Sequence, residues 1–86
     1  MGDARGERIL DVRELEPPQP MVRVLAALRE LPRGSWLLMK HRRVPVPLYP
    51  ILDEQGFEHR TRPNDAGEVE VRIWHTDDPA PPNASP

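Results

Sequence analysis

The segment LEPPQPMVRVL, from Leu15 to Leu25, places three prolines within four positions and then continues as a helical pattern of apolar residues. The first N–H groups of a helix have no intrahelical partner, so Pro18 and Pro20 cost little there and fix φ near its helical value. Pro17 keeps the preceding residue extended. Apolar residues then recur at helical spacing, at Met21, Val24, Leu25, Leu28 and Leu31. The segment therefore predicts a helix over 18–31 with one apolar face.

Strands are predicted on both sides of this helix. Arg8 to Val12 forms a short β pattern before it, and the sequence Leu-Pro-Arg-Gly at 31–34 ends the helix. Ser35 to His41 follows as a strand in which the run from Trp36 to Met39 is too apolar for an exposed edge. We therefore expect this strand to lie in the centre of a sheet.

A second, shorter helix is predicted in the middle of the chain. Pro45 or Pro47 opens it, apolar residues follow through 48–52, and Gly56 closes it. Two strands complete the chain, so the predicted order is β-α-β-α-β-β, an α+β fold. Two helices on one face of a four-stranded sheet would make a two-layer α/β sandwich.

The last two strands are predicted to form a hairpin. Residues 57–62 and 68–75 alternate between apolar and polar residues around a loop at Pro63 to Gly67. In this pattern the side chains that face the helices are Phe57, His59 and Thr61. The loop length sets opposite charges against one another on the other face, at Glu58 and Arg72, Arg60 and Glu70, and Arg62 and Glu68. We prefer this register because a two-residue slip would oppose two arginines.

The composition limits what the chain can be. Its 86 residues allow one domain with a thin core. We expect residues 1–7 to be a flexible N-terminus, residues 8–75 to form the single domain, and residues 76–86 to be a disordered, proline-rich tail.

Several function classes are excluded or disfavoured by composition. The absence of cysteine excludes disulfides, thiolate metal sites and cysteine nucleophiles. No apolar stretch has the length of a signal peptide or of a membrane-spanning helix, so we expect a cytoplasmic, soluble monomer with no membrane partner. A formal net charge of −2 makes nucleic acid an unlikely partner.

An ordered set of short motifs resembles a known bacterial family. The motifs are Leu10-Asp11-Val12-Arg13, Leu15-Glu16-Pro17-Pro18-Gln19-Pro20, the turn at Leu31 to Gly34, and Pro47-Leu48-Tyr49 before Gly56-Phe57. Together they resemble the domain of unknown function 2249 family, over about Ile9 to Trp74. That family is similar to the TusA/SirA-like sulfur carriers, and the resemblance implies their sheet order 1-2-4-3 with the last strand antiparallel to the rest.

The resemblance also locates a missing residue. The carriers hold a reactive cysteine in a Cys-Pro-x-Pro motif at the start of their first helix, and here that motif reads Pro17-Pro18-Gln19-Pro20. Proline has no nucleophilic atom, so sulfur transfer through Pro17 is excluded. The resemblance further implies an association with hemerythrin-like domains and nitrogen respiration.

A basic cluster is expected at one edge of the implied sheet. The first three strands are parallel in that topology, so their carboxyl ends and the starts of both helices meet at one edge, where function usually lies in such sheets. That edge would collect Arg13, Lys40, His41, Arg42, Arg43 and Arg62, with the helix starts adding free N–H donors. We expect it to recognise an anion or an acidic protein partner. The alternative is a solvated basic loop balanced by Glu14, Glu16 and Glu68.

Other chemistry has little support in the sequence. His41, His59 and His75 lack metal-ligand spacing, and no catalytic set stands out, so we expect no cofactor and no enzyme. A redox or metal-associated accessory domain that uses His41 is the alternative function. Trp74 and Arg72 fall on the face away from the helices, where an exposed indole would mark an interface or cap the sheet by packing on an arginine stem.

Overall fold

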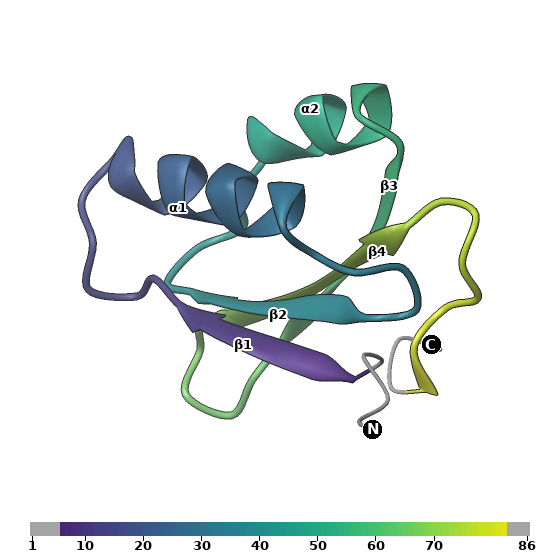
Figure 1. Ribbon diagram of the computed structural model, residues 1–86. Coiled ribbons are helices and arrows are strands. Elements are labelled where there is room, and N and C mark those ends of the chain that lie inside the picture. The colour runs from purple at the N-terminus through teal and green to yellow at the C-terminus, as the bar shows by residue number, and fades with distance from the viewer. Residues whose placement is uncertain (1–5, 83–86) are drawn as a thin grey trace.

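The computed structural model describes residues 6–82, and it has the predicted order of elements. These elements are β1 (Glu7–Asp11), α1 (Gln19–Arg29), β2 (Trp36–His41), α2 (Leu48–Glu54), β3 (Phe57–Pro63) and β4 (Val69–His75). The sheet order is β1-β2-β4-β3, with β1 parallel to β2 and β4 antiparallel to β2 and β3. Both helices lie on one face of the sheet (Figure 1). The predicted two-layer α/β sandwich is therefore confirmed.

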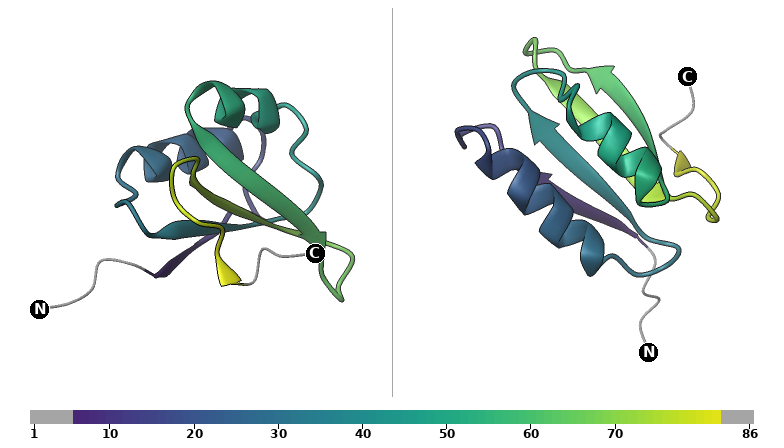
Figure 2. Two further views of the ribbon diagram at one scale, coloured as in Figure 1. Left: turned by 90° about the vertical axis from the view of Figure 1, so that its right-hand side faces the viewer. Right: turned by 90° about the horizontal axis from the view of Figure 1, so that it is seen from above.

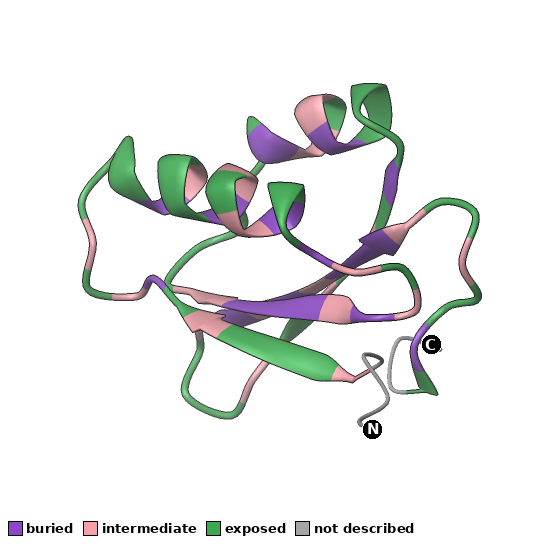
Figure 3. Ribbon diagram, viewed as in Figure 1, coloured by how far each residue is buried: buried purple, intermediate pink, exposed green. Residues whose placement is uncertain are grey.

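The core lies between the helices and the sheet. Seen from above, the two helices lie side by side over the strands (Figure 2), and much of the ribbon coloured as buried lies on the sides of the helices next to the sheet and on the central strands (Figure 3). The helices contribute Val24 and Leu28 from α1 and Leu48 and Leu52 from α2. The sheet contributes Leu37, Met39, Val71 and Ile73. The strand β2 is central, as its apolar run predicted.

The hairpin of β3 and β4 corrects one prediction. The faces are as expected, because Phe57 and Val71 are buried on the helix side. The predicted register is wrong by two residues. In the structure Arg60 lies opposite Arg72, Glu58 opposite Trp74 and Arg62 opposite Glu70. A slip of two positions preserves the alternation of the strand, so burial alone could not distinguish the two registers.

The turn between these strands explains the register. The Gly67 N–H donates to the Asn64 carbonyl at 3.2 Å, and Asn64 Oδ1 accepts the N–H groups of Ala66 and Glu68, both at 2.9 Å. Gly67 has φ of +81°, which only glycine adopts at no steric cost. This is the three-residue hairpin loop that ends in a left-handed glycine. Its geometry outweighs exposed cross-strand charge pairs, each of which contributes only about 0.2–1 kcal/mol.

Asn64→Ala should lower the free energy of unfolding by about 1 kcal/mol, because two backbone N–H groups lose their acceptor. Urea unfolding measures the change. Asn64→Asp keeps an acceptor oxygen and should retain most of the stability. Equal stability of wild type and Asn64→Ala would show that the side chain does not hold the turn.

Near both ends of the chain, the described residues are more ordered than the sequence predicts. Glu7 belongs to β1 rather than to a flexible terminus. The tail is packed at least to Pro81: the Thr76 N–H donates to the Gly56 carbonyl at 2.9 Å, and Pro81 is buried. Residues 1–5 and 83–86 of the two expected mobile ends lie outside the described residues.

Candidate functional site

The carboxyl ends of β1, β2 and β3 meet at one edge of the sheet, together with the starts of both helices. The six expected site residues all lie at or near this edge. Strand alternation nevertheless divides them between the two faces of the sheet. Lys40 and Arg62 belong to the face away from the helices, whereas His41 belongs to the helix side.

The basic residues on the open face belong to a row of alternating charge. The strand registers place Asp11 beside Lys40, Lys40 beside Glu70, and Glu70 beside Arg62. Lys40 and Arg62 therefore each have at least one acidic neighbour on an adjacent strand. Such pairs favour the sheet modestly and reduce the attraction of the row for an external anion.

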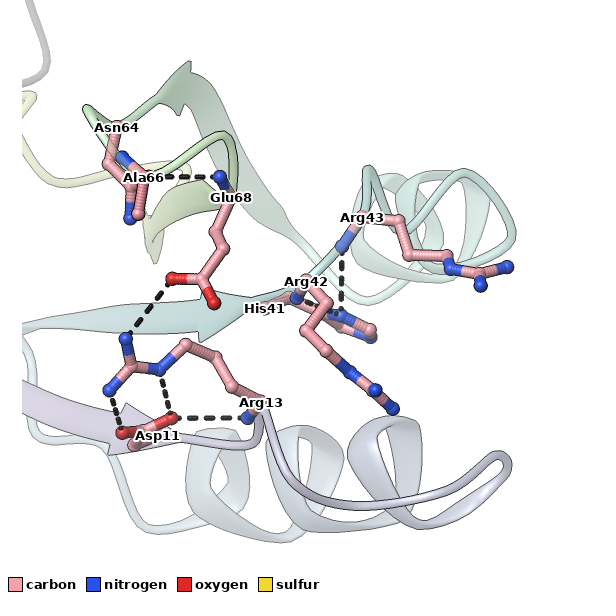
Figure 4. A network of polar contacts seen from close by, with 8 residues as sticks. All are labelled: Asp11, Arg13, His41, Arg42, Arg43, Asn64, Ala66 and Glu68. Atoms are coloured by element: carbon pink, nitrogen blue, oxygen red, sulfur yellow. Dashed lines mark hydrogen bonds and ion pairs between the residues drawn. The ribbon is translucent and has the colours of Figure 1, made fainter.

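Arg13 is held by two carboxylates. Its Nη2 lies 2.6 Å from Asp11 Oδ2, its Nε 2.8 Å from Asp11 Oδ1, and its Nη1 3.1 Å from Glu68 Oε1 (Figure 4). The hydrogen bonds from Arg13 to the Asp11 carboxylate lower the pKa of Asp11 to about 2. The Asp11 and Glu68 carboxylates in turn raise the pKa of Arg13. Arg13 thus joins the end of β1 to the start of β4, and its charge is balanced within the fold.

An apolar pocket of about 270 Å³ lies on the helix side of the same edge. The prolines that precede and start the helices line it, at Pro17, Pro18, Pro20, Pro45 and Pro47. Two residues of the core, Met39 and Leu48, also line the pocket, and His41 and Arg43 are its polar lining residues. Pro17 lies where the resemblance places the carrier cysteine. The sequence does contain a signal for this pocket, since prolines flank the starts of both helices.

The helix starts supply fewer free N–H donors than the sequence alone predicts. Pro18 and Pro20 have no N–H, and the Gln19 N–H donates to the Glu16 carbonyl at 2.8 Å. At the start of α2 the Leu48 N–H donates to Pro45 and the Tyr49 N–H donates to Val46. The same prolines that favour the helix starts therefore make this edge apolar.

His41 provides a neutral polar group beside the pocket. Its Nδ1 accepts the backbone N–H groups of Arg42 at 2.7 Å and Arg43 at 3.3 Å. Burial lowers the pKa of His41, and the charges of Arg42 and Arg43 lower it further. The ring is therefore neutral at pH 7, with its proton on Nε2, because Nδ1 is the acceptor.

Acid should destabilise the fold through His41. Its pKa is lower in the folded chain than the unfolded value of about 6.5, so the unfolded state binds the proton first as the pH falls. Stability should be greatest above pH 6.5 and decrease below it. His41→Asn keeps an acceptor near the Nδ1 position without titrating, so urea unfolding at pH 7.5 and 5.5 should differ less in this variant. An unchanged difference would contradict the assignment.

Arg42 and Arg43 are the cations of this edge that are least compensated. Arg42 Nη2 lies 4.0 Å from Glu16 Oε2, and both side chains are more than half exposed, so this pair is weak. Arg43 lines the pocket. Both guanidinium groups extend away from the Arg13 cluster (Figure 4). The expected six-residue cluster therefore reduces to His41, Arg42 and Arg43 beside an apolar pocket.

The histidines do not come together. Among residues 6–82, no group of three or more His, Cys, Asp or Glu side chains could hold a metal ion. The His59 ring stacks on Tyr49, with 4.4 Å between the ring centroids, and its Nε2 lies 3.3 Å from Asp53 Oδ1. The His75 ring packs against Phe57. Each histidine thus has a separate structural environment.

The expected interface at Trp74 and Arg72 is corrected. Trp74 is only 6% exposed, because the segment after β4 folds over it. Arg72 Nε lies 3.1 Å from Glu7 Oε2, and the same oxygen accepts Trp36 Nε1–H at 2.9 Å. Trp74 is therefore covered, and the charge of Arg72 is paired inside the fold.

The comparisons with known proteins agree with this architecture. The chain is similar to a solved SirA-like protein from Desulfitobacterium hafniense, with a TM-score of 0.67 and 22% identity, over 76% of this chain and 92% of that chain. At this identity the likeness defines the fold class, a SirA-like α/β sandwich. The family model described as "Uncharacterized conserved protein (DUF2249)" matches residues 9–75, so the chain belongs to this family. No curated protein matches the chain. Neither helix within residues 6–82 is long and apolar enough to cross a membrane.

Proposed function

We propose that this chain is a small, non-catalytic binding module that recognises an acidic segment of a partner protein. The observation that carries the proposal is the apolar pocket of about 270 Å³ beside Arg42 and Arg43. These two arginines are the weakly compensated cations of an edge whose other basic residues have acidic neighbours. We call this pocket, with its lining residues His41 and Arg43, the helix-start pocket.

The chemistry of the pocket favours a mixed ligand. Proline rings and the buried Met39 side chain favour an apolar group, while the guanidinium of Arg43 favours a neighbouring carboxylate. The neutral His41 ring can donate a further hydrogen bond from Nε2. Val44 and Val46 are 48% and 63% exposed and extend the apolar surface beside the pocket. A peptide with a large apolar side chain flanked by acidic residues meets all of these requirements.

Other ligands fit less well. A small anion would find few donors, because prolines remove N–H groups from the helix starts and Arg13 is already bound to carboxylates. Nucleic acid would gain only a few phosphate contacts from an anionic chain and would lose them steeply with salt. No observation favours the metal-associated alternative, since His41 Nδ1 already accepts two N–H groups.

An NMR titration tests the proposal. The probe is the peptide Glu-Asp-Leu-Phe-Asp-Glu, added to the ¹⁵N-labelled full chain at low salt. Amide shifts are expected together near residues 17–21 and 41–48. The same peptide with amides in place of carboxylates should bind less tightly, and inorganic phosphate should shift the same amides less. Equal effects of phosphate and peptide would indicate a simple anion site, and scattered shifts would contradict the proposal.

A further inference from the structure

A second concave site lies at the opposite end of the sheet from the helix-start pocket. It is a cavity of about 500 Å³ between the chain after β4 and the strand ends that carry Trp36 and Trp74. The segment 78–82, Asp-Pro-Ala-Pro-Pro, forms its other wall. In Figure 1 this segment continues from β4 towards the end of the sheet where β1 begins. We call the site the tryptophan groove.

Among the described residues, few polar contacts hold the segment over the groove. Asp78 Oδ2 accepts the Gly34 N–H at 2.6 Å, and the Asp78 N–H donates to the His75 carbonyl at 2.9 Å. Arg33 Nη1 lies 3.4 Å from Asp77 Oδ2, but both side chains are largely exposed. The prolines at 79, 81 and 82 have no N–H and cannot join a β ladder. Within residues 6–82, the segment is held mainly by ring packing and by the Asp78 carboxylate, a combination that can open locally.

We propose that this segment is a displaceable occupant of the tryptophan groove, and that the groove binds an acidic, proline-rich segment of a partner protein. Proline-rich chains are extended before binding and dock on aromatic surfaces. The segment 78–82 lies against the two tryptophans of the groove in the same way. The Gly34 N–H and Arg33 complement an acidic residue at the start of such a segment. The groove shares no lining residue with the helix-start pocket.

The unfilled volume of the groove favours a partner segment with a larger side chain as the ligand, rather than the same segment from a second copy of this chain. A cavity of about 500 Å³ remains although residues 78–82 line it, and the only side chain between the prolines of this segment is the small Ala80. A partner segment with a larger apolar residue at that position would fill more of the cavity and contact more of the tryptophan surface. The inferred ligand is therefore Asp-Pro-x-Pro-Pro with a large apolar x.

A competition experiment on the full chain tests displacement. The variant Asp78→Ala with Pro81→Ser weakens the tail, and Pro63→Ser is a control at an exposed proline on β3. The probe is the peptide of residues 76–82 with Ala80→Leu, followed by tryptophan fluorescence. It should bind the variant at least tenfold more tightly than wild type or the control, because the tethered tail competes in those chains. A version with Asn at both aspartates should bind more weakly. Equal affinity for variant and wild type, or no binding to the folded variant, would overturn the proposal.

Hydrogen exchange on the wild-type chain provides a test that does not depend on a variant folding. If the tail opens locally, the Gly34 amide should exchange at least tenfold faster than the slowest amides of the β2–β4 ladder, which require global unfolding. Exchange of Gly34 at the same rate as those amides would show that the segment is a fixed part of the fold and would overturn the proposal.

Discussion

Replacing Glu7 with alanine is expected to lower the free energy of unfolding by about 2–4 kcal/mol, a large effect for a residue at the first position of a strand. The Glu7 carboxylate binds both Arg72 Nε and Trp36 Nε1. The Arg72 side chain is only 11% exposed and lies opposite Arg60, so loss of Glu7 would leave a mostly buried charge beside a like charge. Urea unfolding and the thermal midpoint measure the change.

Two further variants separate the ion pair from simple loss of a surface charge. Glu58→Ala removes an exposed carboxylate opposite Trp74 and should change stability by less than about 0.5 kcal/mol. Arg72→Leu in the Glu7→Ala background removes the stranded charge and should recover part of the stability. If Glu7→Ala and Glu58→Ala had the same small effect, the pairing of Glu7 with Arg72 would not contribute to the fold.

Reversing the charges of Arg42 and Arg43 is expected to weaken binding of the acidic peptide by at least about 30-fold. The double variant Arg42→Glu, Arg43→Glu replaces two attractions with two repulsions beside the helix-start pocket, and about 2 kcal/mol corresponds to that factor. Isothermal calorimetry at fixed salt measures the affinity. Because both side chains are exposed, the fold should keep its stability within about 1 kcal/mol.

The matched control changes the net charge equally at another place. Arg23 and Arg29 are exposed on α1 and line neither pocket. Arg23→Glu with Arg29→Glu should therefore reduce affinity only through the weak long-range field, which salt screens. Equal losses in the two double variants would mean that overall charge, and not the helix-start pocket, determines binding.

Much of the candidate site followed from residue type and order. His41 ends a central strand and Arg42 and Arg43 directly follow it, which placed all three at the edge where both helices begin. The sequence analysis also expected Arg13, Lys40 and Arg62 to act with them. The strand registers place Asp11 and Glu70 beside Lys40 and Glu70 beside Arg62, and an ion pair joins Glu68 to Arg13. Each of these pairs joins residues on different strands or far apart in the chain, so only the tertiary structure shows them.

The fold was determined largely by local patterns. Apolar spacing, prolines at helix starts and a glycine with φ of +87° at position 56 each act over a few residues, so they specify the elements and their buried faces before any tertiary contact forms. The absence of cysteine likewise excludes a cysteine persulfide within these 86 residues without reference to structure.

Tertiary structure determined the partners of groups that local patterns leave open. The hairpin register depended on the hydrogen bonds of Asn64 and on a distant partner for Arg72, and not on the nearest opposite charges. The cover over Trp74 depended on a tail without a strand or helix pattern. In each case a weak, non-directional preference in the sequence was outweighed by specific contacts between residues well separated in the chain. Packing and hydrogen-bond geometry fix such contacts only when the whole sheet has formed.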